Sequence, residues 1–124
     1  MIRVFLVDDQ TLVRQGVRSL LELADGIEVV AEASDGKQAV KQIPLVKPDV
    51  VLMDMRMPVM SGLDALQALS KANALPPTII LTTFDDDQLV LAGIKYGAKG
   101  YLLKDVSLDQ LVTAIQAVAT GGSL

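Results

Sequence analysis

The sequence has 124 residues, 51% of them apolar, and carries a formal net charge of −4 at pH 7. This length fits one domain, and the apolar content can fill one hydrophobic core without covalent cross-links. Because the chain contains no cysteine, disulfides, thiolate metal sites and cysteine nucleophiles are excluded, and a cytoplasmic location fits best. The negative charge makes the chain itself a poor binder of nucleic acid, because each phosphate contact needs a Lys or Arg.

Five short apolar runs alternate along the chain with longer segments of helical period. Most of the runs are continuously apolar, as expected of parallel strands that helices cover on both faces. None approaches the roughly 20 residues that a membrane-spanning helix needs. The alternation predicts an α/β fold, a doubly wound five-stranded parallel sheet with helices on both faces, whose strands cover residues 2–7, 28–32, 49–53, 78–82 and 99–103.

The segments between the runs have apolar stripes and capping residues. The first helix has its stripe at Val13, Val17, Leu20, Leu21 and Ala24, and the last at Leu108, Leu111, Val112, Ile115, Val118 and Ala119. Helix starts that pair a capping residue with a glutamine three positions later are Asp35 with Gln38, Asp85 with Gln88, and Ser107 with Gln110. Short loops rich in Gly and Pro predict one domain over residues 1–124, with an ordered core to about residue 120 and a flexible end at 121–124.

Polar side chains follow four of the predicted strands directly. In an open parallel sheet the carboxyl ends of the strands border the ligand crevice, so these side chains should converge. Several carboxylates that meet in one crevice repel each other unless a cation lies between them. The predicted site therefore binds a hard divalent ion, Mg²⁺ or Mn²⁺, and comprises Asp8, Asp9, Asp54, Thr82, Thr83 and Lys104.

The residue types in this crevice suit phosphoryl chemistry. Asp9 and Asp54 are the expected direct metal ligands, with Asp8 acting through water. Lys104 and the Thr82 hydroxyl can bind oxygens of an added phosphoryl group. The remaining Asp54 oxygen is then a nucleophile that can form an aspartyl phosphate, a covalent state that water reverses.

Each element taken alone has an ordinary explanation. An Asp pair after a strand often only forms a turn, and a lone Lys is usually a solvated surface charge. The acidic run at residues 85–87 is explained by the dipole at a helix start, and Tyr101 by a partly buried strand aromatic. The prediction depends on the joint occurrence of these residues at successive strand ends.

The motifs Val7-Asp8-Asp9, Leu52 to Pro58, Gly62, Leu81-Thr82-Thr83 and Lys104 resemble those of the receiver domains of two-component response regulators. The resemblance covers nearly the whole chain. It implies the flavodoxin-like strand order 2-1-3-4-5, for which a receiver is a standard example. It also implies that the domain is a phosphoacceptor that assists only its own phosphorylation and dephosphorylation, and is not an enzyme acting on other substrates.

The resemblance assigns roles residue by residue. Asp54 is the phosphoacceptor, and Mg²⁺ is held by Asp8, Asp9, Asp54 and the main-chain carbonyl of Arg56. Thr82 is the switch hydroxyl and Lys104 the phosphate-binding ammonium group, while Tyr101 turns inward with Thr82. Two further positions, Arg56 and Phe84, are expected to tune the lifetime of the phosphoryl group.

The segment 97–105 and the closing 121–124 resemble the branch with LuxR-type helix-turn-helix output domains. Residues 121–124 would then begin the linker to an output domain, which alone would contact DNA. The expected partners are a sensor histidine kinase and a second copy of the chain. The second copy would bind after phosphorylation, through the fourth helix, fifth strand and fifth helix or through the first and fifth helices, and so control transcription.

One position departs from the family pattern, because Asp105 follows the lysine where many receivers have a proline after a cis bond. A cis bond before a residue other than proline costs about 2.5–4 kcal/mol, so the isomer of Lys104-Asp105 stays open. Because the chain has no histidine, its phosphoryl donor must be a separate kinase or a small acyl phosphate.

Three other functions are alternatives to a switch controlled by phosphorylation of Asp54. The domain can be a constitutive interaction module, whose contacts form whatever the state of Asp54. It can be an aspartate-nucleophile phosphatase, although the sequence offers no obvious acid for the leaving group. A flavin-binding protein shares the fold, but Asp8 and Asp9 stand where a flavin phosphate would need hydrogen-bond donors.

Overall fold

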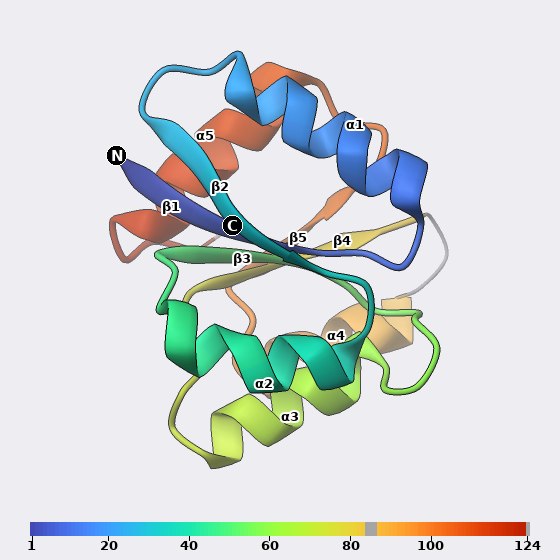
Figure 1. The fold of residues 1–124 in the computed structure, drawn as a ribbon. Helices are drawn as coiled ribbons and strands as arrows, with labels where there is room; N and C mark the ends of the chain where they lie inside the picture. The colour runs from blue at the N-terminus through green and yellow to red at the C-terminus, as the bar shows by residue number, and fades with distance from the viewer. Residues whose placement is uncertain (84–86, 124) are drawn as a thin grey trace.

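The computed structural model describes residues 1–83 and 87–123. All five predicted strands form, and they pair in parallel in the order β2-β1-β3-β4-β5. This arrangement (Figure 1) confirms the doubly wound α/β fold with flavodoxin-like strand order. The strands are β1 (Ile2–Val7), β2 (Ile27–Ala33), β3 (Val50–Asp54), β4 (Thr78–Thr82) and β5 (Gly100–Leu103).

Helices cover both faces of the sheet. In Figure 1, α1 (Thr11–Glu22) and α5 (Leu108–Ala119) lie on one face, and α2 (Gly36–Val46), α3 (Gly62–Lys71) and α4 (Asp87–Lys95) on the other. Side chains of β1 alternate between the layers, as strand geometry requires. Val4 and Leu6 pack with Leu21 of α1, whereas Phe5 and Val7 pack in the cluster that includes α2 and α3.

Element bounds differ slightly from the prediction. Strand β3 begins and ends one residue later than expected, so Asp54 is its last residue. In α1, Leu21 is fully buried but Leu20 is 43% exposed. Adjacent helical residues differ by about 100° in direction, so only one of the two leucines can face the core. The apolar stripe of α5 packs on the sheet as predicted.

Helix caps follow the predicted pattern where the structure describes them. The Asp35 side chain accepts a hydrogen bond from the main-chain N–H of Gln38 at 2.8 Å. Ser107 and Gln110 form the full reciprocal capping box. The predicted cap at Asp85 lies outside the described residues. Within the part of the chain that is described, no helix combines the length and apolar character needed to cross a membrane.

Candidate functional site

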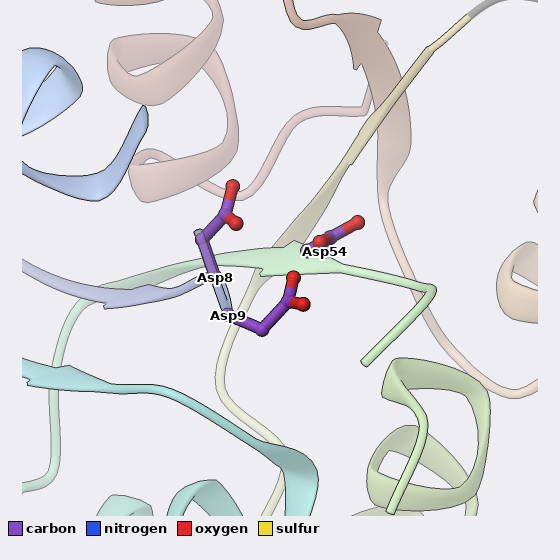
Figure 2. A group of neighbouring side chains, drawn as sticks. All are labelled: Asp8, Asp9 and Asp54. Carbon is purple, nitrogen blue, oxygen red and sulfur yellow. The ribbon is translucent and has the colours of Figure 1, made fainter. Parts of the chain in front are cut away.

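Three aspartates meet where β1 and β3 end. Asp8 and Asp9 follow β1, and Asp54 closes the adjacent β3. Each offers one carboxylate oxygen, and these oxygens lie within 4.8 Å of one another. Figure 2 shows the three side chains grouped at the carboxyl ends of the strands. The convergence predicted from the sequence therefore occurs for all three carboxylates.

Asp8 is the most deeply placed of the three. It is fully buried, and its Oδ1 accepts a hydrogen bond of 2.9 Å from the main-chain N–H of Gln10. Its Oδ2 is buried without a hydrogen bond, although the Lys104 Nζ lies 3.3 Å away as an ion pair. A buried carboxylate oxygen that lacks a hydrogen bond is costly, so this oxygen can accept a further positively charged partner.

Lys104 bridges the carboxylates from the other side of the cleft. Its Nζ lies 3.2 Å from Asp54 Oδ2 and 3.3 Å from Asp8 Oδ2. Its main-chain N–H donates to the Thr82 carbonyl at 2.8 Å, which continues the pairing of β5 with β4 beyond the strand end. The lysine after β5 is therefore a fixed part of the site, and the surface-charge interpretation of this residue is wrong.

Burial and neighbouring charges shift the ionisation of the site. Burial raises the pKa of Asp54 to about 6; the nearby Lys104 charge opposes this effect and the Asp8 charge adds to it. Burial lowers the pKa of Lys104, but the carboxylates of Asp54 and Asp8 outweigh it, and the net pKa is raised. One ammonium group does not fully compensate the clustered carboxylates, which favours a second cation at the site.

A cavity of about 190 Å³ opens beside Asp54. The main-chain N–H of Arg56 lies 3.4 Å from Asp54 Oδ1, a long contact. This places the turn after β3 against the phosphoacceptor candidate. The residues that line the cavity are Asp9, Gln10, Asp54, Arg56, Thr82, Thr83 and Lys104.

The other predicted residues have different surroundings. Thr82 is buried, and its hydroxyl donates to the Thr83 carbonyl at 2.8 Å. Tyr101 is 49% exposed, so its ring lies at the surface and is less buried than a typical strand aromatic. Phe84 lies outside the described residues. The Lys104-Asp105 bond is trans, since the described residues contain no cis peptide bond.

The donor set suits a hard divalent cation. All three side chains offer carboxylate oxygens, the ligands that Mg²⁺ and similar ions prefer. The Asp8 oxygen without a hydrogen bond and the repulsion between the Asp8 and Asp54 charges both favour a further cation at this point. The cluster Asp8, Asp9 and Asp54 therefore fits a metal site.

Two contacts at the site were not anticipated from the sequence. The main chain of Gln10 binds Asp8 Oδ1, and the Arg14 guanidinium donates to the Asp8 carbonyl at 2.7 Å. From the sequence alone, an arginine one turn into a helix is interpreted as an ordinary surface charge. Only the orientation of α1 relative to β1, which a single sequence does not give, brings Arg14 behind the cleft.

A doubly wound sheet that gathers three carboxylates and a lysine at its carboxyl edge defines a receiver-type phosphoacceptor domain. The chain matches the family model "Response regulator receiver domain" over residues 4–116. The chain belongs to this family. It is therefore a signalling phosphoacceptor domain rather than a classical enzyme.

Similar proteins indicate which group of response regulators the chain resembles. The chain is 48% identical to the nitrate/nitrite response regulator protein NarP of Escherichia coli, over 98% of the chain and 57% of NarP. The structure of the receiver domain of a response regulator, NarL from Mycobacterium tuberculosis, matches with a TM-score of 0.90 and 35% identity, over 97% of each chain. A LuxR-family response regulator from Aurantimonas matches with a TM-score of 0.91 and 33% identity, over 99% of this chain and 88% of that one.

These matches identify relatives among LuxR/NarL-type transcriptional regulators. The chain spans a little over half the length of the curated relatives it matches. The activities of those whole proteins therefore come to this chain only as proposals.

Proposed function

We propose that Asp54 accepts a phosphoryl group from a sensor histidine kinase and that this modification shifts the domain between an inactive and an active state. The observation that carries the proposal is the position of the Lys104 Nζ, 3.2 Å from Asp54 Oδ2 and 3.3 Å from Asp8 Oδ2. A lysine held between two carboxylates can also bind an oxygen of a group attached to one of them.

The proposed metal is Mg²⁺ or Mn²⁺. Asp9, Asp54 and the main-chain carbonyl of Arg56 would bind it directly, and Asp8 through water. When bound, such an ion offsets the negative charge that the carboxylates and an incoming phosphoryl group bring together. The fit rests on the clustered carboxylate oxygens and on the Asp8 oxygen that lacks a hydrogen bond.

In the proposed reaction an Asp54 oxygen attacks the phosphorus of a phosphohistidine. A P–O bond to Asp54 forms, the P–N bond breaks, and its electron pair stays on the imidazole of the kinase. The phosphohistidine does not come from these 124 residues, which contain no histidine. Lys104, already beside Asp54, pairs with an oxygen of the transferred group. With acetyl phosphate, a P–O bond breaks and acetate leaves.

The proposed switch uses Thr82 and Tyr101. The Thr82 hydroxyl now donates to the Thr83 carbonyl, and a phosphoryl oxygen would offer a stronger, charged acceptor. Movement of the Thr82 hydroxyl toward the phosphoryl group would leave room for the half-exposed Tyr101 ring to turn inward. We assign tuning of the phosphoryl lifetime to Arg56, which lines the cavity, and to Phe84.

The active state is proposed to form a homodimer, placing an attached output domain on DNA and controlling transcription. Exposed apolar residues support two surfaces. One comprises Leu91 and Ile94 of α4 with Tyr101 and Leu103 of β5. The other, for a dimer through α1 and α5, includes Leu12 of α1 and Leu23 at its C-terminal end. Residues 121–124 would begin the linker to the output domain. A cytoplasmic location follows from the proposed donors, which are made inside the cell.

The direct test incubates the protein with Mg²⁺ and acetyl phosphate and measures its intact mass. We expect one added phosphoryl group on the wild type and none on Asp54→Ala. Asp25→Ala, which changes an exposed turn aspartate, should be modified like the wild type. If neither acetyl phosphate nor a panel of histidine kinases modifies Asp54, the proposal is wrong.

Two further measurements separate the competing functions. Repeated phosphate release from a panel of phosphoesters would indicate a phosphatase instead of a switch. Sedimentation that is identical with and without beryllofluoride, a mimic of the phosphoryl group, would indicate a constitutive interaction module. We expect single modification and a change of sedimentation with beryllofluoride.

A further inference from the structure

The turn between β1 and α1 carries both Asp8 and Asp9, and Arg14 holds it from behind. Arg14 lies one turn into α1, and its Nη1 donates to the Asp8 carbonyl at 2.7 Å. Its Nε donates to Glu32 Oε1 on β2 at 3.0 Å. The side chains of Arg14 and Glu32 are only 16% and 23% exposed, so water screens this pair only partly.

The Asp8 carbonyl lies just past the end of regular sheet pairing. The last pairs of β1 are Val7 with Ala33 on one side and Val7 with Met53 on the other. The Asp8 N–H still reaches the Ala33 carbonyl at 3.1 Å, but the Asp8 carbonyl is beyond the last β1 pair. Arg14 gives this carbonyl a charged donor at the point where the chain leaves the sheet.

The orientation of the Asp8 carbonyl fixes the position of the Asp9 Cα. The carbonyl belongs to the planar peptide group that joins Asp8 to Asp9. Fixing its oxygen fixes this plane, and with it the position from which the Asp9 side chain leaves the main chain. Glu32 anchors the other end of the guanidinium to β2, where it pairs in register with Leu6 of β1.

We propose that Arg14 is a positioning residue for the metal site: by joining the Asp8 carbonyl to Glu32, it holds the Asp8–Asp9 turn in the geometry that binds the cation. This inference rests on the proposed function, because it requires the aspartate cluster to bind Mg²⁺ or Mn²⁺. Arg14 itself would act through the Asp8 main chain and would contact neither the cation nor the phosphoryl group. Loss of a residue that supports metal ligands typically weakens metal binding by 10–100-fold.

The same helix provides a matched control. Arg18, one turn further along α1, pairs with the same Glu32 and with Glu22. Within the described residues it makes no hydrogen bond or ion pair with Asp8. Arg14→Gln and Arg18→Gln therefore remove the same charge from the same helix and each remove one partner of Glu32. Only Arg14→Gln removes the donor to the Asp8 carbonyl.

The first measurement uses metal-free protein and does not depend on activity. Hydrogen–deuterium exchange is followed at the Gln10 amide, which donates to Asp8 Oδ1 within this turn. We expect faster exchange in Arg14→Gln than in Arg18→Gln, at a temperature well below the melting point of both. Equal exchange in the two variants overturns the inference, because the turn would then not depend on Arg14.

The second measurement titrates Mg²⁺ into the wild type and both variants, and follows binding and the rate of phosphorylation by acetyl phosphate. For Arg14→Gln we expect a roughly tenfold higher Mg²⁺ concentration at half-maximal binding. The maximal rate at saturating Mg²⁺ should stay within about twofold of the wild type. Arg14→Lys, which lacks the fork that spans two acceptors, should bind Mg²⁺ almost as weakly as Arg14→Gln.

The outcomes separate this inference from the proposed function. If the wild type binds Mg²⁺ and is modified but Arg14→Gln behaves like Arg18→Gln, the inference fails and the proposed function stands. If the wild type neither binds Mg²⁺ nor accepts a phosphoryl group, both fail. A maximal rate that stays low at saturating Mg²⁺ would give Arg14 a role other than metal positioning and overturns the proposal.

Discussion

Asp54 is kept ionised in a buried site at the expense of stability. Its pKa is raised from 3.8 to about 6, first by burial and then by the Asp8 charge, against the attraction of Lys104. The folded protein therefore binds this proton more tightly than the unfolded chain does. As pH rises from about 4 to 6, the metal-free protein loses stability, and above the folded-state pKa the loss is complete.

The substitution Asp54→Asn should remove this cost. Since one pKa unit corresponds to about 1.4 kcal/mol, we expect the variant to be about 2–3 kcal/mol more stable than the wild type at pH 7.5 without metal. The advantage should vanish near pH 4. Urea unfolding in EDTA across this pH range measures it. Asp25→Asn, at the opposite end of the sheet, is the control, and parallel curves for the two variants would contradict the prediction.

Bound Mg²⁺ should make the wild type more stable than Asp54→Asn, the reverse of the order expected without metal. Mg²⁺ binds the folded wild type through Asp54 in our proposal, so it should stabilise the wild type by RT ln(1 + [Mg²⁺]/Kd). Asp54→Asn lacks a metal-binding carboxylate and should gain far less. Thermal melts of both proteins, with EDTA and then with increasing Mg²⁺, test this. An equal rise of both melting temperatures would place the bound metal elsewhere.

Val59 adopts an unusual backbone conformation beside the site. Its φ is 69°, and the Met60 N–H donates to the Pro58 carbonyl at 2.7 Å. A bond between residues two apart around a positive φ is the rare γ-turn, which is strained for a β-branched residue. Since Val59 is 79% exposed, its side chain gains little from packing in return.

Val59→Gly should therefore stabilise the domain by about 1 kcal/mol, because glycine adopts positive φ without a steric penalty. Val59→Ala keeps a Cβ and should recover only part of this gain. Urea unfolding measures the stability of both variants: the midpoint should shift while the dependence of the unfolding free energy on urea concentration stays unchanged. If Val59→Gly is no more stable than Val59→Ala, the strain is not in the Cβ contact.

At the scale of elements, β3 and α3 approach each other too closely for any side chain at Gly62. A Cβ added there would lie 2.1 Å from the Asp54 carbonyl oxygen and 2.8 Å from the Met55 Cα. Both are backbone atoms, which cannot rotate away. The start of α3 therefore packs against the strand end that carries Asp54, so the glycine position and the site geometry are linked.

We expect Gly62→Ala to destabilise the domain by about 1–3 kcal/mol, the usual cost of overpacking. It should also weaken Mg²⁺ binding, since it displaces the Asp54 main chain. Gly16→Ala is the matched control: an added Cβ there meets nothing within 4 Å, and alanine should stabilise α1 by up to about 1 kcal/mol. A Gly62→Ala variant as stable as the wild type would contradict this packing.

Elements were predictable from the sequence where local signals and burial agree. The apolar runs gave the strands, and Ser107 with Gln110 gave the start of α5. The strand order was not derivable from the pattern and came from the family resemblance. The side chains at strand ends were predictable because parallel strands bring their carboxyl ends to one edge. The contact of Arg14 with the Asp8 carbonyl was not predictable, since it depends on the orientation in which α1 packs on the sheet.

At the scale of the whole molecule, the exposed apolar side chains determine which face can dimerise. Leu91 and Ile94 of α4 are 67% and 43% exposed, and Tyr101 and Leu103 of β5 are 49% and 39% exposed. Leu12 of α1 and Leu23, the residue that caps its C-terminal end, are 84% and 75% exposed. Each group would lose exposed apolar area in a dimer, at about 25 cal/mol per Å², so both surfaces are candidates.

The position of Tyr101 favours the surface of α4, β5 and α5 as the dimer interface. In our proposal its ring moves when Thr82 turns toward the phosphoryl group, so this surface changes shape with the state of Asp54. The α1 surface contains neither switch residue. A dimer that forms only after phosphorylation should therefore use the surface that includes Tyr101.

Single substitutions distinguish the two surfaces. With beryllofluoride and Mg²⁺, we expect Leu91→Ser to lower the dimer fraction measured by sedimentation velocity and Leu23→Ser to leave it unchanged. Leu91 lies in α4 and Leu23 caps the C-terminal end of α1. Both leucines are exposed, at 67% and 75%, so their effects on folding should be similarly small. The opposite result would assign the dimer to α1 and α5. It would also mean that movement of Tyr101 is not what couples phosphorylation to assembly.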